Sequence, residues 1–67
     1  MAESTYDFLV HVNYITSKSL RVNLGTAVEW LPKSQISSPD MEIEEIEVGD
    51  KVTLTIPEWL AMKKGIL

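Results

Sequence analysis

The stretch TYDFLVHVNY, residues 5–14, decides the fold class of this chain of 67 residues. Every second position in it is aromatic or β-branched, which is the period of a β-strand that turns one face to a core. The residues on this face are Tyr6, Phe8, Val10, Val12 and Tyr14. We therefore expect a strand here and a sheet built outward from it.

Two hairpins are expected next to this strand. Residues 16–19 are small and polar, and apolar and polar side chains then alternate over residues 20–24, which predicts a second strand. Gly25 can adopt the left-handed conformation of a tight turn, so a third strand is expected before Pro32. Pro32 ends that strand, because proline donates no hydrogen bond to a sheet.

The acidic stretch MEIEEIEV, residues 41–48, predicts a fourth strand that is interrupted. Its apolar side chains change parity at Glu44–Glu45, where the extra residue of a β-bulge would return them to one face and bend the strand. The residues that the bulge would align are Met41, Ile43, Ile46 and Val48. Residues 32–40 are expected to form a loop with one helical turn at residues 33–36, and residues 51–56 a fifth strand.

The C-terminal stretch changes from the period of a strand to helix-forming residues. Pro57 suits the first position of a helix and Gly65 its C-terminal cap. We expect a short helix over about residues 57–64 that docks through Trp59 and Met62, which lie three apart. The fold class is therefore mainly β: a small five-stranded antiparallel barrel or curled sheet with a short C-terminal helix.

The composition limits what such a domain can do. Residues 1–67 have room for one small core, and without Cys no disulfide can support it. The start, MAESTYDF, resembles no signal peptide, and no apolar run approaches the ~18 residues of a spanning helix, so a soluble cytoplasmic protein without a membrane partner is expected. Ten acidic and six basic residues give a net charge of -4, which disfavours nucleic acid as a partner.

No arrangement of residues predicts catalysis. His11 is the only histidine and Cys is absent, so the usual zinc ligands are missing and no metal site is expected. The three glycines are isolated, which does not match a phosphate-binding loop. No spacing pairs His11 with a Ser or Thr nucleophile. We expect a protein that is not an enzyme, that needs no cofactor, and in which His11 is a strand-face residue.

The two tryptophans could either pack a core or form a recognition surface, because indole rings are enriched in both. Trp30 ends the third expected strand, and Trp59 lies on the expected docking face of the helix. We expect both rings to be buried between helix and sheet.

Six of the ten acidic residues lie within eleven positions, and they have two interpretations. They are Asp40, Glu42, Glu44, Glu45, Glu47 and Asp50. The first interpretation is a solvated face that also protects a sheet edge from aggregation. The second is a docking strip for the Lys and Arg side chains of a partner, with acids two apart separated by about 6.6 Å along a strand.

Two segments carry a family resemblance. WLPKSQI (Trp30–Ile36) and IPEWLAMKKG (Ile56–Gly65), with an acidic stretch between them, resemble a group of short, uncharacterised phage and prophage proteins. The resemblance implies a phage or prophage origin and a small β fold, and it brings no catalytic residues. Proteins of this size and origin are often replication accessories or inhibitors of host defence, anti-CRISPR proteins among them.

Three functions follow from these observations. The first is a non-enzymatic, anti-CRISPR-like module that docks its acidic run on the basic surface of a protein in the host cytosol. The second is a phage replication or recombination accessory that binds single-stranded nucleic acid; the third is a homodimer formed through an open sheet edge, with Leu9 and Ile15 turned outward. The candidate nucleic-acid contacts are Tyr6, Tyr14 and Trp30 for stacking, and Arg21, Lys33, Lys63 and Lys64 for phosphate.

Overall fold

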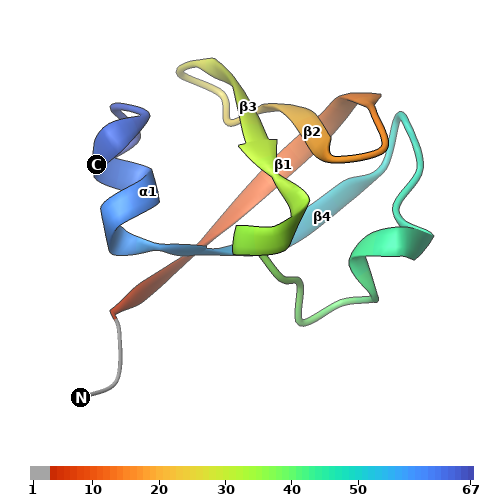
Figure 1. Ribbon diagram of the computed structural model, residues 1–67. Helices are drawn as coiled ribbons and strands as arrows, with labels where there is room; N and C mark the ends of the chain where they lie inside the picture. Colours follow the sequence, from red (N-terminus) through yellow and green to blue (C-terminus); the bar gives the residue numbers. More distant parts are fainter. Residues whose placement is uncertain (1–3) are drawn as a thin grey trace.

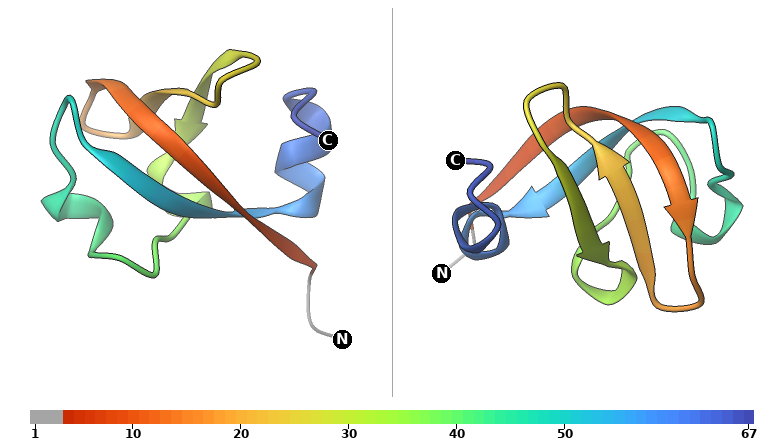
Figure 2. Two further views of the ribbon diagram at one scale, coloured as in Figure 1. Left: turned by 180° about the vertical axis from the view of Figure 1, so that it is seen from behind. Right: turned by 90° about the horizontal axis from the view of Figure 1, so that it is seen from above.

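The structure is a computed structural model that describes residues 4–67, and within them four antiparallel strands form one sheet (Figure 1). The strands are β1 (Thr5–Ile15), β2 (Ser19–Asn23), β3 (Val28–Pro32) and β4 (Lys51–Pro57). Their order is β3-β2-β1-β4, so three strands linked by hairpins are followed by a fourth that returns beside the first, as in a Greek key. The sheet is curled but not closed (Figure 2). The mainly β class is therefore confirmed, whereas an open sheet of four strands replaces the five-stranded barrel.

β1 contains an irregularity that the sequence did not reveal. Val12 lies opposite Val22 and Tyr14 lies opposite Arg21, so β1 has one extra residue at this point, as at a β-bulge. Side chains after this point change faces. Tyr14 therefore points away from the core that Val10 and Val12 enter, and its predicted place on their face is wrong.

The core lies on one face of the sheet, where alternate strand residues meet the connection between β3 and β4 and the C-terminal helix. Its members are Val10, Val12, Leu20, Val22, Leu31, Ile36, Ile46, Val52, Leu54, Ile56, Leu60 and Ala61. The helix and the turn at residues 43–45 lie at opposite ends of the molecule (Figures 1 and 2). A second layer made of loop and helix thus covers the apolar face that a single sheet would expose.

The connection between β3 and β4 contains two short 3₁₀ turns and no strand among the described residues. The first, η1 (Lys33–Gln35), confirms the helical turn that was predicted after Pro32. The second, η2 (Ile43–Glu45), replaces the predicted fourth strand, so the bulge at Glu44–Glu45 is wrong. A 3₁₀ helix has three residues per turn, so Ile43 and Ile46 lie on the same side and face the core. A bulged strand would also have placed these two side chains on one face.

The helix α1 (Glu58–Lys63) is close to the predicted segment, with Pro57 just before its first turn. Gly65 adopts a φ of 74°, and its N–H donates to Met62 O while Ile66 N–H donates to Ala61 O. These two bonds form a Schellman motif, which confirms the predicted glycine cap.

The docking face of α1 differs from the predicted one. Leu60 and Ala61 are buried, whereas Trp59 is 46% exposed and Met62 is also exposed. Trp30 is 41% exposed, so the predicted burial of both tryptophans is wrong. Either side of this six-residue helix could pack on the core. The direction in which the chain leaves β4 determines which side does so.

Candidate functional site

The face of the sheet opposite the core carries the exposed strand side chains, and we call it the outer face. Strand neighbours form rows across it, because opposed side chains in antiparallel strands lie about 5 Å apart. One row runs from β4 to β3 through Lys51, His11, Asn23 and Val28. The next row consists of Tyr14, Arg21 and Trp30, and we call it the aromatic row.

In the aromatic row, Arg21 lies on the strand between the strands that carry two exposed aromatic residues. The ring centroids of Tyr14 and Trp30 are 6.2 Å apart, with an edge-to-face angle of 68°. Tyr14 lies on β1 and Trp30 on β3, the two strands on either side of β2. The backbones of β1 and β3 are about 9.6 Å apart. The rings therefore lean toward each other across the strand that carries Arg21, and Tyr14 stays 53% exposed.

A shallow depression of about 270 Å³ lies at the β2–β3 turn, along the row that contains Lys51, His11 and Asn23. Its lining includes Leu9, His11, Asn23 and Lys51. Asn23 Oδ1 accepts a hydrogen bond of 2.7 Å from Gly25 N–H, which holds the turn beside it. His11 is exposed on the outer face, in agreement with its prediction as a strand-face residue.

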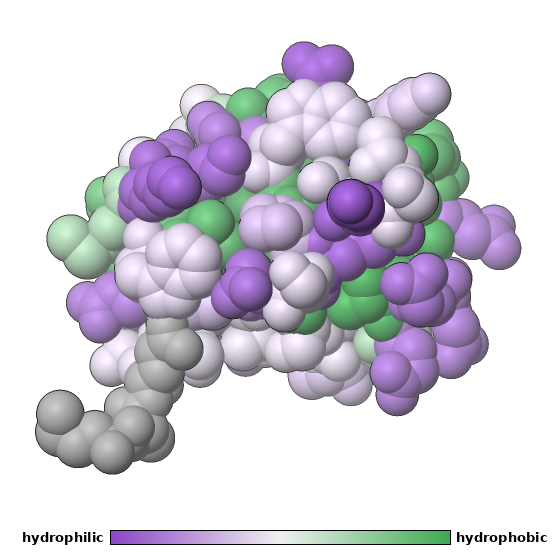
Figure 3. Space-filling model, in the orientation of Figure 1, coloured by the Kyte–Doolittle hydropathy of each residue, from purple (hydrophilic) through white to green (hydrophobic). Residues whose placement is uncertain are grey.

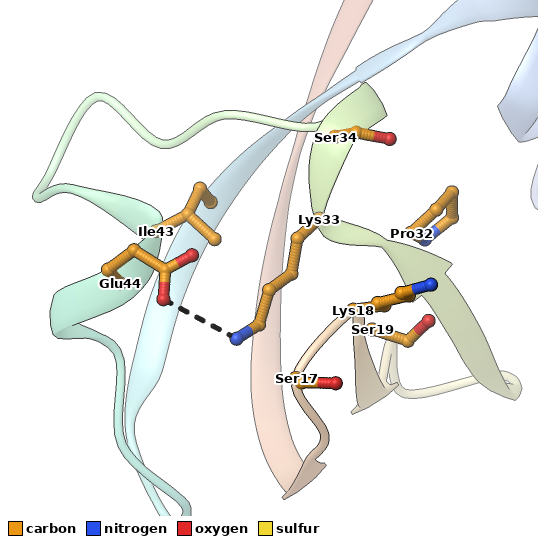
Figure 4. A pocket seen from close by; sticks show the side chains of 8 residues that line it. All are labelled: Ser17, Lys18, Ser19, Pro32, Lys33, Ser34, Ile43 and Glu44. Carbon is orange, nitrogen blue, oxygen red and sulfur yellow. Dashed lines mark ion pairs between the residues drawn. The ribbon is translucent and has the colours of Figure 1, made fainter.

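A larger pocket of about 700 Å³ lies at the other end of β2, and we call it the Lys33 pocket (Figure 4). It is lined by Ser17, Lys18, Ser19, Pro32, Lys33, Ser34, Ile43 and Glu44. A hydrogen bond of 2.8 Å from Lys33 N–H to Lys18 O joins η1 to the β1–β2 turn. The pocket thus forms where three segments that are distant in sequence meet.

β2 connects these three features. Its outward residues, at every second position, are Asn23 at the shallow depression, Arg21 in the aromatic row and Ser19 at the Lys33 pocket. Four residues of strand cover roughly 13 Å. The outer face therefore offers a continuous track in which apolar rings alternate with polar and basic groups.

The six acids of the connection do not lie along a strand, as the predicted strip assumed. Asp40 Oδ2 accepts a hydrogen bond of 2.9 Å from Thr53 N–H, and Asp50 Oδ2 accepts one of 2.9 Å from Glu47 N–H. Glu44 Oε2 lies 3.6 Å from Lys33 Nζ. Half of the set therefore has a structural partner, and the spacing expected along a strand does not apply because the segment is not a strand.

The structure brings together some of the residues that were predicted to contact nucleic acid. Tyr14, Arg21 and Trp30 come together, whereas Tyr6 lies opposite Ile56, outside the aromatic row. Lys63 and Lys64 belong to α1 and its C-terminal cap and take no place in the strand rows. The residues missed from the sequence are Lys18, Asn23 and Lys51, which only the strand register and the turn bring to the outer face.

Within residues 4–67, no group of three His, Asp or Glu side chains could hold a metal ion, and no helix is long and apolar enough to cross a membrane. Figure 3 shows a surface on which hydrophilic groups surround smaller apolar areas.

The comparisons found no matching family model, no matching curated protein and no matching solved structure. The resemblance to short phage proteins therefore stays a prediction.

Proposed function

We propose that the protein binds single-stranded nucleic acid on its outer face, without catalysis. The observation that carries the proposal is the aromatic row, in which exposed Tyr14 and Trp30 lean toward each other across Arg21. Bases of a single strand expose their faces and stack on such rings, each contact contributing about 1–3 kcal/mol. A guanidinium beside the rings can stack on a base or pair with a phosphate.

The distribution of charge supports this partner more than the net charge does. Arg21 and Lys51 lie on the outer face, and Lys18 lies at its end. The connection that carries six of the ten acids packs Ile36 and Ile46 into the core, on the opposite side of the sheet. The segment that carries these acids therefore belongs to the layer that covers the core, although Glu44 also lines the Lys33 pocket.

The experiment uses the two tryptophans as matched probes, because both are nearly half exposed. Trp59→Phe leaves Trp30 as the single tryptophan, and its fluorescence should fall when an oligothymidylate is added. Trp30→Phe leaves Trp59, on α1, and its fluorescence should not change. Equal responses in the two variants, or no response in either, would contradict binding at the aromatic row.

A second candidate, docking of a basic protein surface, is favoured by the exposed acids of the connection whose side chains have neither an ion pair nor a hydrogen bond among residues 4–67. These are Glu42, Glu45 and Glu47. Changing all three to Gln should slow association with such a protein, most strongly at low salt. An origin in a phage, with a role in replication or against host defence, is compatible with either proposal.

A further inference from the structure

The Lys33 pocket contains a lysine whose side chain is mostly covered and whose ammonium group makes one long ion pair. The side chain of Lys33 is 13% exposed, and its ion-pair partner among the described residues is Glu44, at 3.6 Å. Glu44 is itself 81% exposed, so its carboxylate is well solvated and free to leave. An ammonium has three donors, and a single ion pair at 3.6 Å leaves donors available for another anion.

The lining of the Lys33 pocket contains groups that bind phosphate oxygens. Three hydroxyl groups, from Ser17, Ser19 and Ser34, line the same pocket, together with Lys18 (Figure 4). Lys and Ser side chains are among the usual donors to phosphates of nucleic acids. Pro32 and Ile43 add apolar lining. The volume of about 700 Å³ falls in the range of sites that hold small molecules, so a nucleotide and not only a free anion can enter.

The position of the pocket relates it to the aromatic row. Ser19 and Arg21 are two residues apart on β2 and both point outward, which separates them by about 6.6 Å along the strand. One nucleotide of an extended single strand can span this distance. A base stacked on Trp30 would therefore have a neighbouring phosphate within reach of the Lys33 pocket.

We infer that the Lys33 pocket binds a nucleotide phosphate, which displaces the Glu44 carboxylate from Lys33. The inference rests on the proposed function for the source of the phosphate, which is the strand held at the aromatic row. Glu44 keeps the ammonium paired while the site is empty. The exchange replaces one long contact to an exposed carboxylate with charge-assisted bonds to an anion that carries more charge.

The test is a titration followed by amide NMR, with thymidine monophosphate and thymidine as the matched probes. The monophosphate should shift the amide signals of residues 17–19 and 33–34, whereas thymidine should leave them in place. Lys33→Met should weaken binding of the monophosphate roughly tenfold or more. Glu44→Gln, at an exposed position, should strengthen it about two- to fivefold, since it removes the competing anion. Lys63→Met, on α1, is the control and should bind as the wild type does.

The outcomes separate this inference from the proposed function. If the monophosphate shifts these signals but an oligothymidylate does not bind, the phosphate site stands and the proposed function fails. If the oligothymidylate binds but the pocket signals do not move and Glu44→Gln has no effect, the inference is overturned and the proposed function stands. A gain of affinity in Glu44→Gln cannot arise from misfolding, so this variant decides the matter even if Lys33→Met unfolds.

Discussion

Neighbouring residues on β3 provide a direct test of which face of the sheet is the core. Leu31 is fully buried, whereas Trp30, with a much larger side chain, is 41% exposed. Replacing a buried Leu with Ala costs about 2–5 kcal/mol, which approaches the ~3–5 kcal/mol that a core of this size supplies. Trp30→Ala loses mainly the edge contact with Tyr14, about 0.5–1.5 kcal/mol, and some strand preference. We expect a loss of about 1–2 kcal/mol for Trp30→Ala.

The measurement is urea unfolding followed by circular dichroism, because the Trp variants change the fluorescence signal. Sucrose can be added to give Leu31→Ala a folded baseline, since excluded osmolytes strengthen burial. Trp59→Ala is the control and should also lose little. If Trp30→Ala lost as much stability as Leu31→Ala, Trp30 would belong to the core and the assignment of the outer face would be refuted.

Three further changes test separate features. Gly65→Ala should lower the free energy of unfolding by about 1–2 kcal/mol, because Ala is strained at a φ of 74°, and Gly65→Asn should lose less; thermal melts distinguish them. Asp40→Ala should cost about 0.5–1.5 kcal/mol by removing the acceptor of Thr53 N–H, while Asp40→Asn keeps an oxygen there and should unfold close to the wild type. Contacts from three basic side chains on or beside the outer face should give oligothymidylate binding a slope of about −2 in log K against log salt, and a flat salt series would argue against phosphate contacts.

The elements that follow from local chemistry were predictable from the sequence. The alternation of apolar and polar residues predicted the two hairpins and β4. Gly65 predicted the end of α1, because a left-handed cap favours glycine. The segment at residues 41–48 was not predictable, since Ile43 and Ile46 share one side in a bulged strand and in a 3₁₀ turn alike. What decides between them is whether a partner strand is available, and that depends on the whole fold.

The candidate site was predictable in its residue types but not in its arrangement. Tyr14, Trp30 and Arg21 were chosen because aromatic and basic side chains suit nucleic acid. Their meeting depends on the extra residue in β1, which turns Tyr14 outward to lie opposite Arg21. Lys51 was missed for a related reason, because its place beside His11 follows from the pairing of β1 with β4 across forty residues of sequence.

The two edges of the sheet differ in a way that limits how copies could associate. Along β4, the backbone groups of Thr53 and Thr55 bond to Ser37, Ser38 and Asp40, so that edge is occupied. β1 is an interior strand, so it offers no free edge for the expected dimer, although Leu9 is exposed on the outer face. β3 is the other edge strand, and within residues 4–67 no hydrogen bond is made by its backbone groups that point away from β2. Two chains joined through β3 would present only occupied β4 edges at both ends, so assembly by strand addition would stop at a pair instead of growing into a fibre.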